Sequence, residues 1–276
     1  MNAQPSPLSA GETRELYAFG TTLIEECRAL VLELWEQNSY ESELKSDKSP
    51  VTQVDIRAEE LLRARINERY PDHGILGEEF GTTNTDSDYC WTIDPIDGTD
   101  NLVRRIPTFG TMLGLSYKQV PVLGYLDHPA LGFCLSGGKG LGVTRNGVPL
   151  PKLPPVPQGA AIELETVGIS TPLMAARNGS LGMFDTVVHT FRNSRMYYDC
   201  YGHSLALLGG LSAMVELNLR LWDMLPISAL MAEVGGLWVP LPRSELDLEK
   251  GYCHAVFGRP EVVRAVLRAL GVAEGE

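Results

Sequence analysis

A proline-rich segment limits what this chain can fold into more than any other feature. Five prolines fall within Val148–Gly159, at positions 149, 151, 154, 155 and 157. Proline fixes its own φ and has no amide hydrogen to donate, so the segment cannot continue a helix or an inner strand. We therefore expect two structural parts, an N-terminal one over residues 1–150 and a C-terminal one over residues 151–276.

The N-terminal part opens with two helical patterns. Ser9 and Glu12 have the spacing of a capping box, and the apolar residues behind them recur at three- and four-residue steps, which predicts an amphipathic helix to about Glu36. A second helix is expected from near Thr52 to a turn cluster at residues 71–74. The stretch Ser39–Pro50 between them is polar and is expected to be a loop.

The pattern then changes to short strands. Between residues 89 and 144, β-rich runs punctuated by Gly, Pro and Asn predict an antiparallel sheet over Cys90–Ile93, Phe109–Tyr117, Val122–Asp127 and Gly132–Leu135. After the proline-rich segment, strand-like runs alternate with helical stretches, which indicates an α/β layer that ends in a helix over residues 260–270. These runs are Ala160–Leu164, Met196–Tyr198, Ala213–Leu217, Leu237–Val239 and Cys253–Phe257.

Composition argues against several classes of protein. The formal net charge is −12 and there is no basic stripe, so we expect no nucleic-acid partner and no binding to anionic membranes. No apolar run approaches the roughly 20 residues of a membrane-spanning helix. The five cysteines show no C-x-x-C pairing, which favours reduced thiols in a cytoplasmic protein. The histidines show no zinc-site spacing.

The run Trp91–Asn101 carries the strongest chemical signal. Asp94 and Asp97 lie three residues apart on an apolar run that is expected to stop at its proline, so both carboxylates can converge with the Ile96 carbonyl between them. Mg²⁺ prefers such oxygen ligands. Two aspartates at this spacing are by themselves weak evidence for a metal site, because turns are rich in Asp and Gly for backbone reasons. The whole string D-P-I-D-G-T behind an apolar strand, and after Gly77-Glu78-Glu79, is far more specific.

Four blocks together resemble the magnesium-dependent inositol monophosphatase superfamily, and the resemblance covers most of the chain. The blocks occur in the family's order: Ser49–Asp55, Ile75–Glu79, Trp91–Asn101 and Leu221–Met224, the last followed by a helical stretch ending Glu233-Val234-Gly235-Gly236. The resemblance implies an α+β or α/β fold, built as a layered αβαβα sandwich with the active site between its two halves. It also implies a homodimer.

The resemblance further implies that a small phosphate monoester is hydrolysed by metal-activated water, with two to three Mg²⁺ as cofactor. Glu78, Asp94 and the Ile96 carbonyl would hold the ion that activates water. Asp94, Asp97 and Asp223 would hold the ion that faces the leaving oxygen, and Glu78 would also bind a third, weaker ion. An acidic chain needs such cations to accept a negatively charged phosphate.

Three other positions are implied to act on water and phosphate. Thr99 would accept or relay the proton of the attacking water, with its hydroxyl oriented by Asp55. Gly98 and Thr99 open a segment whose backbone N–H groups could hold phosphate oxygens, as helix N-termini do.

Several of these residues have simpler explanations. Asp55 could be only an acidic residue of a first helical turn, and Asp223 could be a plain N-cap. Glu79, beside Glu78, is expected to be a surface or supporting residue. Gly137-Gly138-Lys139-Gly140 lacks the spacing of a phosphate-binding loop and is expected to be a hairpin or surface turn.

The polar loop leaves two interpretations open. Lys45, Asp47 and Lys48 could belong to a loop that closes on the metals, as in the family, or they could be a solvated run of charges.

Other positions concern the leaving group. Tyr198–Gly202 and four shorter segments resemble the histidinol-phosphate phosphatase branch: Phe109–Met112, Pro121–Pro129, Asn146-Gly147 and Ile169–Thr171. Asp199 and Glu216 would place two carboxylates at the substrate's organic part, where they suit a cationic amine. Asp199 could instead be a strand-end or helix-cap residue. Asp100-Asn101 after D-G-T is closer to the inositol branch.

We therefore expect histidinol phosphate or a similar amino-alcohol phosphate as substrate. Inositol phosphate and other small phosphate esters are the alternatives, and a non-catalytic binding member of the fold is a remote one.

Overall fold

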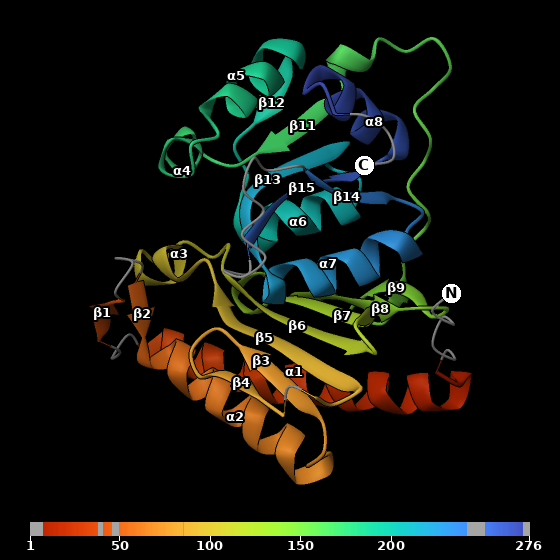
Figure 1. The fold of residues 1–276 in the computed structure, drawn as a ribbon. Coiled ribbons are helices and arrows are strands. Elements are labelled where there is room, and N and C mark those ends of the chain that lie inside the picture. The colour runs from red at the N-terminus through yellow and green to blue at the C-terminus, as the bar shows by residue number, and fades with distance from the viewer. Residues whose placement is uncertain (1–7, 38–40, 46–49, 85, 242–251, 273–276) are drawn as a thin grey trace.

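The computed structural model describes residues 8–37, 41–45, 50–84, 86–241 and 252–272, which form five stacked layers (Figure 1). Helices α1 (Ala10–Gln37) and α2 (Gln53–Arg69) cover the outer face of an eight-stranded sheet. Helices α6 (Asp199–Leu207) and α7 (Leu221–Glu233) lie between this sheet and a five-stranded sheet. The far side of the second sheet carries α4 (Pro172–Arg177), α5 (Leu181–Thr190) and α8 (Pro260–Ala269). The expected αβαβα sandwich is confirmed.

The first sheet is antiparallel except where β3 pairs with β5, as the strand pattern predicted. Its strand order is β10-β9-β8-β7-β6-β5-β3-β4. The bounds are β3 Gly74–Gly77, β4 Gly81–Thr83, β5 Tyr89–Asp97, β6 Gly110–Tyr117, β7 Val120–His128, β8 Phe133–Gly138, β9 Gly142–Arg145 and β10 Val148–Pro149, with a 3₁₀ turn η1 at Pro129–Leu131.

One expectation about β5 is wrong, because the strand does not stop at Pro95 but continues to Asp97. Its pairing with β6 shifts register between Asp94 and Asp97, and the Thr111 hydroxyl donates a 2.9 Å hydrogen bond to the Pro95 carbonyl. A bulge of this kind tolerates a residue that lacks an amide hydrogen. The strand therefore holds both aspartates on ordered backbone.

The second sheet has the order β12-β11-β13-β15-β14 and mixes parallel and antiparallel pairs. Three strand predictions after residue 210 are confirmed, but Ala160–Leu164 and Met196–Tyr198 are not strands. The first holds a 3₁₀ turn, η2 (Ile162–Leu164), and the second is exposed chain that joins no strand among the described residues. The bounds are β11 Thr166–Ile169, β12 Asn193–Arg195, β13 Ala213–Arg220, β14 Leu237–Leu241 and β15 Tyr252–Gly258.

The helix ends follow the sequence closely. The Ser9 hydroxyl accepts the Glu12 amide at 3.2 Å, so α1 begins where its cap predicted. Thr52 caps α2. Part of the stretch expected to be a loop is paired instead, since β1 (Ser42–Leu44) and β2 (Pro50–Thr52) form an antiparallel pair.

The glycine-rich turn between β8 and β9 is a hairpin turn, as expected. The amides of Gly140 and Gly142 each donate to the Glu233 carboxylate at 3.1 Å. The turn therefore binds a carboxylate of α7 and serves to anchor that helix.

The proline-rich connection contains no helix or strand from Leu150 to Ala161. Every strand of the eight-stranded sheet precedes it and every strand of the five-stranded sheet follows it. Helix α7 follows the proline-rich connection but packs on the first sheet at Gly114 and Gly124, so the two halves share one interface. The division into two parts, residues 1–150 and 151–276, therefore remains a prediction.

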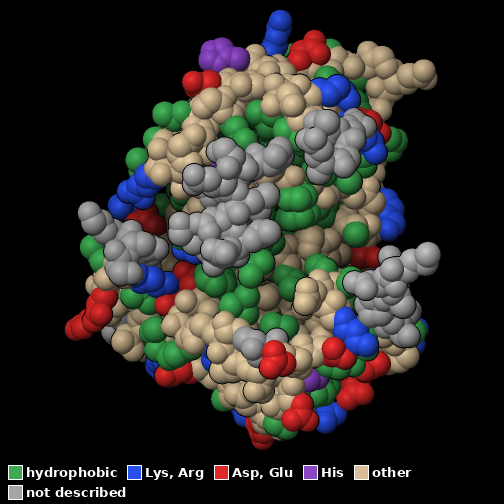
Figure 2. All heavy atoms as spheres, in the orientation of Figure 1, with side chains coloured by type: hydrophobic (Ala, Val, Ile, Leu, Met, Phe, Trp, Pro, Cys, Tyr) green, Lys and Arg blue, Asp and Glu red, His purple; other side chains and the backbone are tan. Residues whose placement is uncertain are grey.

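Surface and thiol features agree with the composition. Lysine and arginine side chains on the face drawn in Figure 2 are scattered and form no stripe. All five cysteines are free. Among the described residues, no helix is long and apolar enough to cross a membrane.

The close packing of α7 generates a stability prediction. A Cβ at Gly124 would lie 2.4 Å from the Pro226 carbonyl oxygen, which is backbone and cannot move away alone. We expect Gly124→Ala to lower the free energy of unfolding, measured with urea, by about 1–3 kcal/mol. Gly182→Ala is the control, because no atom other than those of its chain neighbours and its own helix backbone lies within 4 Å of its Cβ position in α5. There we expect a gain of up to about 1 kcal/mol. Equal effects of the two changes would contradict the packing account.

Candidate active site

A cavity of about 720 Å³ opens between the two sheets, and most of the residues singled out in the sequence line it. The first sheet contributes the end of β5 and the short helix α3 (Thr99–Val103). The second part contributes the starts of α4, α6 and α7 and the middle of β13. The cavity thus lies at the junction of the two halves, where the resemblance implied an active site.

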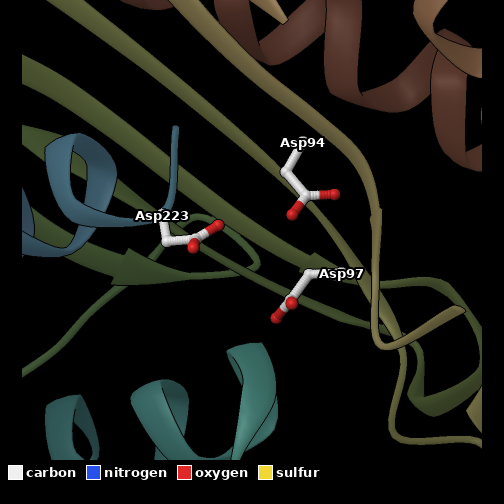
Figure 3. A group of neighbouring side chains, drawn as sticks. All are labelled: Asp94, Asp97 and Asp223. Carbon is white, nitrogen blue, oxygen red and sulfur yellow. The ribbon is translucent and has the colours of Figure 1, made fainter. Parts of the chain in front are cut away.

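Three carboxylates converge in this cavity. One oxygen each of Asp94, Asp97 and Asp223 lies within 4.8 Å of the others. Figure 3 shows that the first two project from β5 and that Asp223 reaches toward them from the start of α7. The register shift in β5 explains the arrangement, because it lets residues three apart face the same cavity.

This donor set fits a hard cation. Oδ1 of Asp94 and Oδ1 of Asp223 are buried and have no hydrogen-bond partner among the described residues. Burial, followed by the charges of Glu78, Asp97 and Asp223, raises the pKa of Asp94 well above its ordinary value. Burial and Asp97 raise the pKa of Asp223 to about 8. A divalent ion would offset this repulsion and occupy the two unpartnered oxygens, and carboxylate oxygens are the ligands Mg²⁺ accepts.

The remaining oxygens of two of these aspartates are held by backbone amides. Oδ2 of Asp223 accepts the Arg220 amide at 2.8 Å, so Asp223 also stabilises the start of α7. The Cys200 amide, in the first turn of α6, donates to Oδ2 of Asp97. Capping and ligation are therefore compatible for Asp223, since each uses a different oxygen.

Glu78 lies beside the three aspartates but outside their tight group, and it is paired with a lysine. Lys45 Nζ lies 2.8 Å from Glu78 Oε1 and 2.6 Å from Glu79 Oε1. Lys45 is thus an ion-pair partner at the cavity rather than part of a solvated run; Asp47 and Lys48 lie outside the described residues. Glu79 pairs with the same lysine, and its expected surface or supporting role stays a prediction.

A fully buried glutamate fixes the backbone around Glu78. The Glu59 carboxylate accepts the amides of Glu79 at 2.8 Å and Phe80 at 3.2 Å, and it also pairs with Arg63 at 2.7 Å. The sequence analysis missed Glu59. Its only signal was an acidic residue on the buried face of the helix that contains Asp55.

Asp55 and Thr99 form the contact that the resemblance implied. Thr99 Oγ1 lies 2.8 Å from Asp55 Oδ1 and 3.0 Å from the Ile96 carbonyl oxygen. Oδ2 of Asp55 accepts the amide and the hydroxyl of Thr52 at 2.8 and 2.6 Å. Asp55 is therefore a first-turn acid of α2 and also the partner of Thr99. Gly98, with φ of 82°, takes the left-handed turn that joins β5 to α3.

The two carboxylates expected at the organic part of a substrate differ in their surroundings. Asp199 is the first residue of α6 and lines the cavity, with one 3.3 Å contact from the Asn101 side chain. Burial and the neighbouring Asp97 and Glu216 raise its pKa well above the ordinary value.

Glu216 has stronger partners. It accepts a hydrogen bond from Ser170, and its other oxygen lies 3.2 Å from His203 Nε2. Burial lowers the pKa of His203, but the Glu216 carboxylate outweighs this and the net shift is upward. The sequence analysis missed His203, although it lies one helical turn after Asp199 on α6.

The chain belongs to the inositol monophosphatase family, whose sequence model it matches over residues 12–267. Proteins of this family are phosphatases of small phosphorylated metabolites and generally use Mg²⁺. The superfamily resemblance seen in the sequence is confirmed.

Individual relatives differ in the substrates their names state. The chain is 31% identical to the histidinol-phosphatase of Chlorobaculum parvum, over 78% of this chain and 81% of that protein. It is 26% identical to the inositol-1-monophosphatase of Synechocystis, over 94% and 90% of the two chains. The solved structure of extragenic suppressor protein suhB from Bartonella henselae superposes with a TM-score of 0.81 at 20% identity, covering 95% of this chain and 100% of that one; it supports the fold.

The converging carboxylates generate a metal-binding prediction. Asp97→Asn and Asp223→Asn each remove one anionic ligand with little change in size. We expect each to weaken Mg²⁺ binding, measured by calorimetry, at least ~10-fold, which corresponds to about 1.4 kcal/mol. Without Mg²⁺ the melting temperature should hold or rise, because repulsion is relieved. Asp185→Asn, exposed on α5, is the control and should bind Mg²⁺ as the parent does. Unchanged binding in both site variants would contradict the ligand assignment.

Proposed function

We propose that this protein is a Mg²⁺-dependent phosphatase that hydrolyses a small phosphate monoester, with histidinol phosphate or a similar amino-alcohol phosphate as substrate. The observation that carries the proposal is the convergence of Asp94, Asp97 and Asp223 beside the Thr99–Asp55 hydrogen bond. Family membership supports the reaction class.

The metal ligands in this proposal are Glu78, Asp94, Asp97, Asp223 and the Ile96 carbonyl, holding two to three Mg²⁺. When bound, the ions neutralise the phosphoryl charge and make water acidic enough to attack near neutral pH. The two unpartnered carboxylate oxygens of Asp94 and Asp223 support this assignment.

Thr99 is the proposed acceptor for the proton of the attacking water. Its hydroxyl donates to the Asp55 carboxylate, which leaves an oxygen lone pair free to accept from water. Asp55 is fixed at its other oxygen by Thr52, so the hydroxyl is held in one orientation. The backbone amides of Gly98 and Thr99 are the proposed contacts for phosphate oxygens.

Asp199 is the proposed contact for a substrate amine. Burial and the nearby carboxylates of Asp97 and Glu216 raise its pKa, and a substrate ammonium would supply the positive charge that favours its ionised form. The charge of Glu216 is compensated by His203. We therefore propose that Glu216 mainly shapes this part of the cavity and keeps it polar, and does not bind the amine itself. The histidinol-phosphatase relative supports this choice of substrate.

Inositol phosphate is the second candidate. Asp100-Asn101 after the D-G-T string is closer to that branch, and the inositol-1-monophosphatase relative aligns over 94% of this chain. A non-catalytic member of the fold is poorly supported, because every residue assigned to metal and water is present. We also propose a cytoplasmic homodimer; the free cysteines support the compartment, and the resemblance supports the dimer.

The proposal predicts obligatory metal dependence. Phosphate release from a panel that includes histidinol phosphate and inositol phosphate should stop with chelator and return with added Mg²⁺. Among the panel, histidinol phosphate should give the highest kcat/KM. Full activity without metal would refute the mechanism, whereas activity on inositol phosphate alone would refute only the choice of substrate.

Asp199→Ala tests the amine contact. A charge-assisted hydrogen bond is worth about 1.5–3 kcal/mol, so kcat/KM for an amino-alcohol phosphate should fall roughly ten- to a hundred-fold. A neutral ester such as glycerol phosphate, bound through metal and phosphate, should change little. Asp199→Glu, which keeps the charge, should recover part of the loss. Equal losses on both substrates would show that Asp199 has a structural role.

A further inference from the structure

A second cavity, of about 830 Å³, lies on the other flank of α7. Its floor is the inner face of the first sheet at Leu76, Cys90 and Thr92, from β3 and β5. Trp238 of β14 contributes from the second sheet. The candidate metal ligands lie outside its lining, so it is distinct from the cavity described above.

The cavity exists because α7 is displaced toward β6 and β7. Gly114 and Gly124 have no side chains, so the helix can approach these strands closely. Leu225 and Pro226 lie over Gly114, and Pro226 also lies over Gly124. The neighbouring part of the sheet is left without a helix above it, and Leu76 and Cys90 are only half-buried there. One face of α7 forms a wall of this cavity. Its residues recur at helical spacing: Leu221, Met224, Leu225 and Ser228.

Two buried polar groups in this lining lack partners. Thr92 is 2% exposed, yet its hydroxyl has no hydrogen-bond partner among the described residues. The indole nitrogen of Trp238 is likewise buried and unpartnered there. Leaving a buried polar group without a hydrogen bond is unfavourable, so a ligand that bonds to either one recovers that cost.

The rest of the lining defines the chemistry of the ligand. Apolar residues of the first sheet and α7 provide much of its surface, beside polar residues such as Ser116 and Gln119, and such a mixture is typical of small-molecule sites of this volume. Among the charged residues of the lining, Lys118 Nζ lies 3.6 Å from Asp88, and Asp86 is exposed to solvent. A charged ligand would therefore gain little, and the indole N–H requires a hydrogen-bond acceptor.

We propose that this cavity binds an uncharged, mostly apolar small molecule with at least one hydrogen-bond acceptor, and that its binding is coupled to the metal-binding carboxylates. The coupling follows from two shared elements. Thr92 precedes Asp94 by two residues on the same face of β5, and Met224 follows Asp223 directly on α7. A ligand that moves β5 against α7 changes the separation of Asp94 and Asp223. This coupling rests on the proposed function, whereas the binding site does not.

The binding test uses three neutral carbonyl probes, 7-hydroxycoumarin, acetophenone and 4-hydroxybenzamide, titrated by ligand-observed NMR. At least one should bind saturably, and Ser228→Phe, which fills the cavity, should weaken it at least ten-fold. Ala232→Phe is the matched control, because it adds the same ring to an exposed position on the same helix. Failure of all three probes, or equal affinity in Ser228→Phe, would overturn the site.

Thr92→Val gives a second variant that should fold even if Ser228→Phe does not. It keeps the side-chain shape and removes the unpartnered hydroxyl, so the melting temperature should hold or rise. Probe affinity should fall at least three-fold if the hydroxyl bonds the ligand. Unchanged affinity would overturn the assignment of Thr92 to the site.

Coupling is tested by titrating Mg²⁺ calorimetrically with and without a saturating amount of the bound probe. We expect the dissociation constant for Mg²⁺ to change at least about five-fold, and the probe's own affinity to change reciprocally when Mg²⁺ is present. An unchanged constant would overturn the coupling. No Mg²⁺ binding in either condition would overturn the proposed function and the coupling together, while probe binding would still support the cavity.

Discussion

Repulsion among acidic side chains that share one cavity is the constraint on which the rest of this structure depends. Asp94, Asp97 and Asp223 lie too close together to be ionised at no cost. Burial raises the pKa of each of them, and the charges of neighbouring carboxylates raise it further. A fold that places them there must hold each by other bonds. Backbone amides of Cys200 and Arg220 do so for two of them, and the bulged end of β5 fixes the third.

Helix α7 connects this cluster to the body of the protein. Its first turn carries Asp223, its middle packs on glycines of the first sheet, and its last turn receives the hairpin amides at Glu233. Because the helix is anchored at both ends, a ligand on one flank acts on the other flank by shifting β5 relative to α7. The two cavities share β5 and α7 as walls, which is the route of the proposed coupling.

Much of the fold could be predicted from local sequence. The cap at Ser9, the helix start near Thr52 and the glycine hairpin between β8 and β9 were predicted correctly, because each depends on residues within a few positions. The errors came where local pattern was ambiguous. Met196–Tyr198 is apolar but exposed, and an apolar run of three residues does not distinguish a buried strand from surface chain. A proline in a strand pattern predicts that the strand ends, and a bulge such as the one that accommodates Pro95 cannot be predicted from spacing.

The sequence by itself determined which oxygen donors exist, which strand and helix starts carry them, and, through four ordered blocks, the family. Only the tertiary structure decided that Asp223 meets Asp94 and Asp97, that Lys45 pairs with Glu78, and that His203 offsets Glu216. It also decided that Thr92 and Trp238 face a second cavity. The reason is physical: Coulomb energy and desolvation depend on distance and burial in space, and residues far apart in the chain acquire both only when the sheets and α7 pack together.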